Sequence, residues 1–203
     1  MHVNRAPSWR VEAGSSLEMC FALYLRDCAG LGVIGQPAVC PVKPAVHCVS
    51  PRQVVHDVGG MTALRVEWEA WWYELVAHYG NGTALPTPPD FPELTSMPAL
   101  QRLTHAHYGT ALTWTQERDA AWRQRSLKRM HDGGQRCFGD LVRERELELG
   151  RPARHFSLSV IELPLSETRA WYVEPDRLIL SEDLYDDEAT FRSYVQPVVE
   201  IIA

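Results

Sequence analysis

The chain has 203 residues, of which 45% are hydrophobic and 23% are charged, and its formal net charge is −6. These values are typical of a soluble globular protein, and we expect one domain over residues 1–203. The negative charge argues against general binding to nucleic acid or to anionic membranes. The opening residues have no apolar region of the kind a signal peptide carries, and no apolar run is long enough for a membrane span. We therefore expect a cytoplasmic protein with no membrane segment.

Helical patterns fill most of the first 150 residues. A capping box at Ser15–Glu18, followed by apolar residues at helical spacing, predicts a first helix that ends near Gly30. Residues 31–60 argue against a long helix because they contain four prolines, Pro37, Pro41, Pro44 and Pro51. We interpret this stretch as a Pro-rich loop or irregular segment: a functional flap, a flexible connection or a set of short strands.

The sharpest pattern in the sequence runs from Met61 to Tyr79. Its apolar residues recur at steps of three and four and therefore share one side of a helix: Met61, Leu64, Trp68, Trp71, Trp72, Leu75 and Tyr79. Each tryptophan brings roughly 150–250 Å² of mostly apolar surface, which a solvated helix does not leave in water. We expect other elements to pack against this helix and place it at the centre of the core.

Two more helices are expected, one from about Pro98 to Gly133–Gly134 and one from about Gln135 to Leu149. Three short runs rich in β-formers follow at 156–163, 171–173 and 178–180, and they predict a three-stranded antiparallel meander. A closing helix, capped by Asp186 or Asp187, ends the segment 150–203. The fold class is therefore α+β, with a helical N-terminal two-thirds packed with a small antiparallel β-meander and a C-terminal helix.

Glu67, Glu74 and His78 fall within about 40° of one another on the tryptophan-rich helix. Two carboxylates and an imidazole on one line suit a metal ion or general acid–base catalysis. Metal sites in helical bundles take ligands from several helices, however, and no matching Glu-x-x-His pair occurs elsewhere. We favour an exposed Glu74–His78 pair, with a catalytic cluster as the alternative.

The weaker candidates for metal ligands are Cys40, His47, Cys48 and His56. Seven residues separate Cys20 from Cys28, and seven separate Cys40 from Cys48. Zinc knuckles use about two to four intervening residues, because a short turn aims both thiolates at one ion. We therefore expect five reduced thiols, no bound metal and no other cofactor.

His131 and Asp132 lie beside two glycines, where a carboxylate can orient an imidazole for catalysis, although a plain helix break is the simpler interpretation. The preceding residues form a strip rich in arginine that includes Arg118, Trp122, Arg125 and Arg129. Arg118 and Arg125 are seven residues apart and share a side of the helix, which suits pairing with buried acids or with an anionic ligand. From His155 onward the chain carries ten acidic and three basic side chains. The most economical partner of the strip is this acidic third, or that of a second copy.

These observations favour an accessory or regulatory protein that acts by binding a protein partner or a second copy, without catalysis of its own. Common nucleotide-binding and hydrolase motifs do not occur in the sequence. Trp9, Trp122 and Trp171 would be interface anchors if exposed. A small acid–base or metal-assisted enzyme built on Glu67, Glu74 and His78 is one alternative. Nucleic-acid binding through the arginine strip is another, which the nearby acids make less favourable.

Overall fold

The computed structural model describes residues 9–47, 51–81, 84–131 and 137–203. The chain divides into two compact units, which we call the helical unit (Ser16–Ala121 and Leu163–Glu167) and the sheet unit (Met1–Ser15, Trp122–Glu162 and Thr168–Ala203). The α+β class predicted from the sequence is confirmed. Whether the two units fold as the single expected domain stays a prediction.

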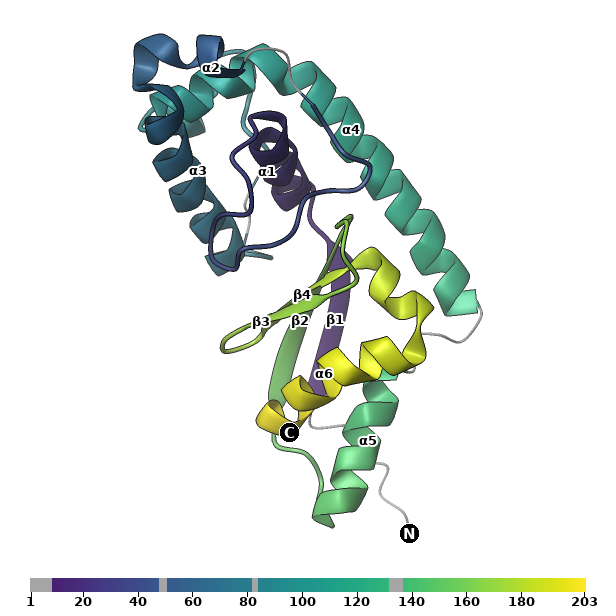
Figure 1. Ribbon diagram of the computed structural model, residues 1–203. Coiled ribbons are helices and arrows are strands. Elements are labelled where there is room, and N and C mark those ends of the chain that lie inside the picture. The colour runs from purple at the N-terminus through teal and green to yellow at the C-terminus, as the bar shows by residue number, and fades with distance from the viewer. Residues whose placement is uncertain (1–8, 48–50, 82–83, 132–136) are drawn as a thin grey trace. The chain divides into compact units, whose positions relative to one another are not determined.

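The helical unit is built on three long helices, α1 (Leu17–Cys28), α3 (Gly60–Ala77) and the first part of α4 (Pro98–His131) (Figure 1). The short helices α2 (Pro51–Val54), η1 (His56–Val58) and η2 (Pro92–Leu94) lie in the connections. α1 begins one residue later than the predicted capping box implies: Ser16, rather than Ser15, is the cap, and its hydroxyl accepts a hydrogen bond from the Met19 amide at 3.1 Å. The break expected at Gly133–Gly134 lies outside the described residues.

The tryptophan-rich helix α3 lies in the core of the helical unit, as predicted. Trp68 and Trp72 are fully buried, and Trp71 keeps only 8% of its surface exposed. The rings of Trp68 and Trp72 stack with their centres 5.5 Å apart. Both indole N–H groups donate to backbone carbonyls, from Trp68 to Ala22 at 2.7 Å and from Trp72 to Pro37 at 3.1 Å. The polar edges of these rings are therefore satisfied within the core.

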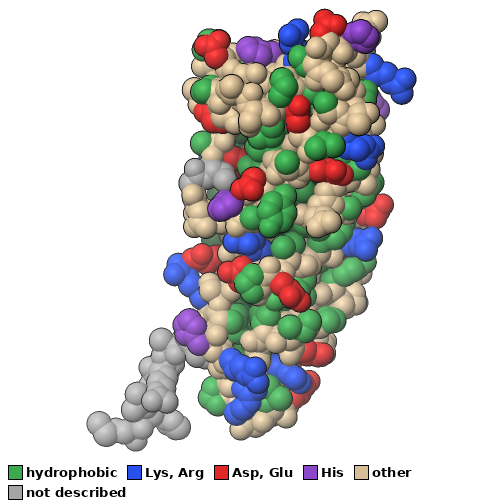
Figure 2. Space-filling view, turned by 90° about the vertical axis from the view of Figure 1, so that its left-hand side faces the viewer, with side chains coloured by type: hydrophobic (Ala, Val, Ile, Leu, Met, Phe, Trp, Pro, Cys, Tyr) green, Lys and Arg blue, Asp and Glu red, His purple; other side chains and the backbone are tan. Residues whose placement is uncertain are grey.

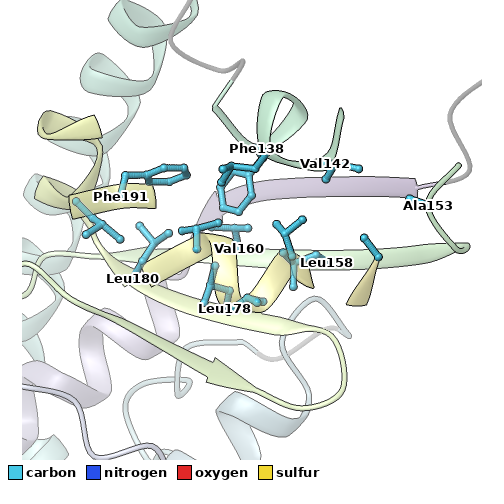
Figure 3. Packing of buried hydrophobic residues seen from close by; sticks show 14 residues of the cluster. Phe138, Val142, Ala153, Leu158, Val160, Leu178, Leu180 and Phe191 are labelled. Carbon is cyan, nitrogen blue, oxygen red and sulfur yellow. The ribbon is translucent and has the colours of Figure 1, made fainter. Parts of the chain in front are cut away.

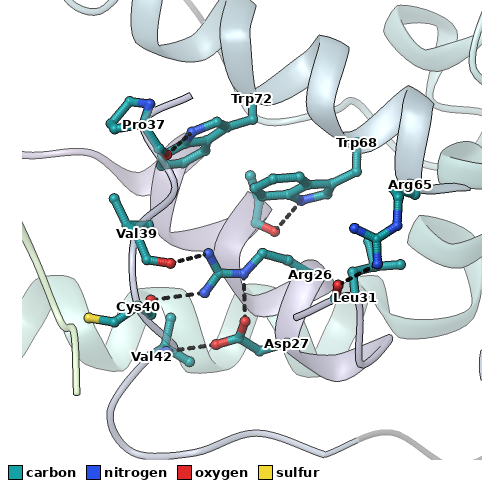
Figure 4. A network of polar contacts seen from close by, with 11 residues as sticks. Arg26, Asp27, Leu31, Pro37, Val39, Cys40, Val42, Arg65, Trp68 and Trp72 are labelled. Atoms are coloured by element: carbon teal, nitrogen blue, oxygen red, sulfur yellow. Dashed lines mark hydrogen bonds and ion pairs between the residues drawn. The ribbon is translucent and has the colours of Figure 1, made fainter. Parts of the chain in front are cut away.

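The Pro-rich segment is fixed to the helical unit by its backbone carbonyls (Figure 4). Arg26 of α1 has no exposed surface and donates to the carbonyls of Val39 and Cys40 at 2.8 and 2.9 Å. Asp27 accepts from the Arg26 Nε at 2.6 Å and from the Val42 amide at 2.6 Å. A buried guanidinium is costly unless it is paired and fully hydrogen-bonded, and here it meets one carboxylate and two carbonyls.

The rest of this segment is held by close backbone contacts. Gly35 has a φ of 96°, and a Cβ there would lie 2.6 Å from Cδ1 of Trp72, so only glycine fits. The Arg65 guanidinium donates to the Leu31 carbonyl at 2.9 Å. Val42 forms an isolated antiparallel bridge with Leu165. In its described part, the segment is thus a hydrogen-bonded loop with one bridge, α2 and η1, rather than a set of strands.

The sheet unit contains one four-stranded mixed sheet, in which the order of strands is β1-β2-β4-β3. The strands are β1 (Trp9–Ser15), β2 (Phe156–Leu163), β3 (Ala170–Val173) and β4 (Arg177–Ser181). β1 pairs in parallel with β2, with Trp9 opposite Phe156 and Ser15 opposite Glu162, while β3 and β4 are antiparallel.

The predicted meander is therefore wrong in two respects. β1 adds a parallel strand, which no local turn signals because its partner lies near the other end of the chain. β4 rather than β3 lies beside β2. Residues Leu163–Glu167 belong to the helical unit, so no tight hairpin joins β2 to β3.

One face of the sheet is covered by α5 (Cys137–Leu149) and α6 (Glu188–Ile202). Figure 3 shows inward side chains of β2 and β4 meeting those of the two helices, among them Leu158, Val160, Leu178, Leu180, Phe138, Val142 and Phe191. The rings of Phe138 and Phe191 meet edge to face with centres 5.1 Å apart. α6 begins at the predicted cap, because the Asp187 carboxylate accepts from the Ala189 amide at 3.0 Å. This covered face positions the site described next.

Candidate functional site

A pocket of about 340 Å³ opens in the sheet unit where β1, the end of α4 and the start of α5 meet. Its volume falls in the range of roughly 300–1,000 Å³ that is usual for ligand sites. The residues that line it all belong to the sheet unit: Trp9, Val11, Ala13, Ser126, Arg129, Cys137, Phe138, Gly139, Arg143, Glu162 and Tyr185.

The strand β1 forms an apolar wall of this pocket. Trp9, Val11 and Ala13 are alternate residues of the strand, so their side chains point to the same face of the sheet. The Trp9 ring stacks on Phe156 of β2 with centres 6.2 Å apart. A Cβ at Gly139 would lie 3.6 Å from the Trp9 ring, an ordinary van der Waals distance, so the start of α5 lies close to this wall.

Arg129 and Glu162 form the polar part of the pocket. Glu162 follows Leu158 and Val160 at the inward positions of β2 and keeps only 2% of its surface exposed. The Arg129 guanidinium donates to its carboxylate. Burial raises the pKa of the Glu162 carboxyl group, and the charge of Arg129 opposes that rise.

A phenol and a thiol, those of Tyr185 and Cys137, also line the pocket. The Arg129 guanidinium lies 4.3 Å from the centre of the Tyr185 ring, which also stacks on Phe191. Burial raises the pKa of the Tyr185 phenol and of the Cys137 thiol. A thiol with a raised pKa is a poor nucleophile, because the thiolate is the reactive form. Burial therefore does not activate the Cys137 thiol as a nucleophile.

Two arginines of the predicted strip pair with the acidic third of the same chain. Arg125 contacts the carboxylates of Glu182 and Asp183, the latter at 3.1 Å, and Arg129 contacts Glu162. The expected pairing with this acidic third is confirmed at these two positions. Of the two, Arg129 alone lines the pocket. Their role in binding a ligand or a partner stays a prediction.

The remaining members of the strip lie elsewhere. Arg118 belongs to the helical unit, where its guanidinium lies 5.8 Å from the Trp114 ring and 3.6 Å from the Glu117 carboxylate. Trp122 is partly buried in the sheet unit. Arg118 therefore lies near an exposed carboxylate of its own helix, whereas the spacing suggested a buried acid or an anionic ligand.

Glu67, Glu74 and His78 do not converge. The carboxylate of Glu74 lies 3.1 Å from the His78 ring in an exposed pair, as favoured from the sequence. Glu67 instead accepts a hydrogen bond from the Leu100 amide at 2.8 Å. Within the described ranges, no group of three His, Cys, Asp or Glu side chains is placed to hold a metal ion. The structure thus does not bring these three side chains together, because Glu67 is directed toward the start of α4. Their role in catalysis stays a prediction.

The candidate metal ligands of the Pro-rich segment differ in their exposure to solvent. Cys40 is buried, whereas His47 and His56 are exposed, and His56 pairs with Asp57 at 2.9 Å. His131 is exposed at the end of α4. Cys48 and Asp132 lie outside the described residues, so the His131–Asp132 pair stays a prediction.

The expectation of five reduced thiols is wrong for Cys28. This cysteine is disulfide-bonded, while Cys20, Cys40 and Cys137 are in the thiol form. A disulfide requires two Cα atoms within about 4.4–6.8 Å, a distance that spacing along the sequence does not reveal.

The pocket residues could be reached only in part from the sequence. Trp9, Val11 and Ala13 alternate with Arg10, Glu12 and Gly14, which is the period of a strand with one apolar face. Glu162 takes an inward position in the same alternation along β2, where a charge is unusual. No comparable signal marks Ser126, Gly139 or Tyr185.

Comparison with protein-family models, with curated proteins and with solved structures finds no match to this chain. None of the helices in the described part of the chain has the length and apolar character needed to cross a membrane. On the face drawn in Figure 2, acidic and basic side chains are interspersed with hydrophobic ones. The pocket in the sheet unit is therefore the candidate functional site.

Proposed function

We propose that this protein is a non-catalytic accessory or regulatory protein whose sheet unit binds a segment of a partner polypeptide. The segment lies along β1 and places one side chain in the adjacent pocket. The observation that carries the proposal is the pocket of about 340 Å³ beside an edge strand. Edge strands offer a row of backbone donors and acceptors, and an adjoining pocket supplies specificity.

Three features of the sheet unit support a polypeptide as the occupant. Among the described strands, β2 alone pairs with β1, so no described strand occupies the other edge of β1. Trp9 provides an aromatic surface of the kind that dominates interface energetics. Arg129 and Glu162 form a largely buried charged pair, and apolar lining residues surround it, as in the centre of many interfaces.

The test begins with a library of random peptides selected on the immobilised full-length chain. Peptides enriched over an unrelated protein are then synthesised and their affinities measured by calorimetry. Ser126→Phe adds a ring at a position that lines the pocket, while Gln124→Phe adds the same ring at an exposed position outside it. We expect Ser126→Phe to weaken binding by about tenfold or more and Gln124→Phe to leave it unchanged.

Hydrogen exchange gives a second measurement on the same complexes. A bound strand should slow exchange of the amides of residues 9–15, since its carbonyls pair with the outer edge of β1. Failure to enrich any peptide, or equal affinity in both variants, would contradict the proposal. Light scattering tests for self-association. If the protein is a dimer and Ser126→Phe dissociates it, the pocket binds a second copy of the chain instead.

A further inference from the structure

The polar side of the pocket has unused hydrogen-bonding capacity. A guanidinium carries five N–H donors. Among the described residues, Glu162 is the one acceptor of a hydrogen bond from Arg129, and 21% of the Arg129 side chain stays exposed. The Arg129 guanidinium lies over the face of the Tyr185 ring, which leaves the N–H donors in the plane of the guanidinium for other partners. Planar donors of this kind match the two oxygens of a carboxylate.

The charges around the pocket favour an anion. Its lining carries two arginines, Arg129 and Arg143, against the single carboxylate of Glu162. This excess of one positive charge is balanced by Asp140, which is not a lining residue and lies 3.1 Å from Arg143. That pair is largely exposed, however, and exposed pairs are screened and weak, so Arg143 can exchange Asp140 for a ligand at little cost.

The other side of the pocket is apolar. Trp9, Val11 and Phe138 offer aromatic and aliphatic surface without hydrogen-bonding groups of their own, apart from the indole N–H. An occupant must therefore combine an anionic group with an apolar one over the span of a single pocket. In a polypeptide, the C-terminal residue has this combination, because its α-carboxylate and its side chain leave the same Cα.

We propose that the pocket recognises the free C-terminus of the partner, with the terminal carboxylate on Arg129 and Arg143 and an apolar terminal side chain against Trp9, Val11 and Phe138. The proposal rests on the function proposed above, and it names the end of the chain as the recognised feature. A bound C-terminus leaves the preceding residues of the partner to pair with the edge of β1, whose alternate residues line the pocket.

The experiment uses one peptide selected with a free C-terminus, prepared in three forms. These are the free acid, the C-terminal amide, and the free acid lengthened by one glycine. We expect the amide to bind the full-length chain about tenfold or more weakly, since it loses a charge-assisted hydrogen bond. The lengthened acid should weaken by a similar factor, because its carboxylate is displaced from the arginines while its charge is kept.

Variants of the protein separate recognition from folding. Arg129→Gln and Arg143→Gln should each reduce the ratio between acid and amide affinities, and Lys128→Gln, exposed next to Arg129, should leave the ratio unchanged. The ratio is informative even where Arg129→Gln lowers stability, and Arg143→Gln changes an exposed side chain. Equal binding of acid and amide to the unmodified protein would overturn this inference and leave peptide binding intact. Absence of any peptide binding would instead remove the proposed function.

Discussion

Glu162 illustrates how one residue links the core of the sheet unit to its pocket. It takes the last inward position after Leu158 and Val160, and its carboxylate meets Arg129. Removing a carboxylate from water disfavours its charged form, and a single guanidinium compensates for only part of that cost. The raised pKa of Glu162 records this balance. Its ionisation therefore opposes folding at neutral pH.

This balance predicts a pH dependence of stability. The folded-state pKa of Glu162 lies above its ordinary value of 4.5, so the folded state holds more protons in the window between the two values. The contribution of Glu162 to stability is full below 4.5 and is lost as the pH rises through the folded-state pKa. For Glu162→Gln, the free energy of unfolding relative to the unmodified protein should rise with pH across that window. Urea unfolding from about pH 4 to about pH 8 measures it.

Glu144 provides a control of opposite sign. Hydrogen bonding to Arg192 lowers the pKa of this exposed carboxyl group. Its contribution is present above the ordinary pKa and is lost as the pH falls, so Glu144→Gln should lose stability relative to the unmodified protein as the pH rises. A rise for both variants would contradict the assignment of the Glu162 effect to burial.

At the scale of elements, Glu67 connects two helices of the helical unit. The first amides of a helix have no partner within it, and a carboxylate nearby satisfies them and complements the helix dipole. Glu67 does this from α3 by accepting from the Leu100 amide near the start of α4. The residue considered for catalysis from the sequence is thus placed as a capping group.

Removal of this contact gives a direct prediction. We expect Glu67→Ala to lower the free energy of unfolding by about 0.5–2 kcal/mol, the usual cost of losing a capping group. Glu74→Ala on the same helix is the matched control, and we expect a change below about 0.5 kcal/mol because its pair with His78 is exposed. Equal losses in urea unfolding would assign the effect to helix propensity rather than to the contact with α4.

The elements were predicted from the sequence where the signal is local. Helical spacing predicted α1 and α3, and the caps at Ser16 and Asp187 lie where short-range chemistry puts them. The sheet was predicted only in part, because strand pairing depends on contacts between distant segments. The alternation at β1 indicates a strand but not its partner β2. The pocket depends on that pairing, so most of its residues were not identified.

At the scale of the whole molecule, two elements belong to both compact units. α4 is one continuous helix, yet residues up to Ala121 belong to the helical unit and those from Trp122 belong to the sheet unit. β2 crosses the same division between Glu162 and Leu163. Domains that unfold separately are usually joined by flexible linkers, whereas these units share a helix and a strand.

We therefore predict one cooperative unfolding transition. Calorimetric and van't Hoff enthalpies should agree, as they do for a single cooperative unit. Leu64→Ala in the core of the helical unit and Val160→Ala in the core of the sheet unit should both lower the midpoint of that same transition. Two transitions, each sensitive to one of these variants, would show two domains instead.

The Pro-rich segment is held by its main chain, and this has a consequence for protein engineering. Arg26, Arg65 and Trp72 donate hydrogen bonds to backbone carbonyl oxygens of the segment, and every amino acid has such an oxygen. Apart from Gly35 and the buried positions, the route of the segment is thus largely indifferent to the identity of its side chains. Val33, Gln36 and Ala38 are exposed along it. Randomising these three positions would turn the segment into a display scaffold with a preset backbone.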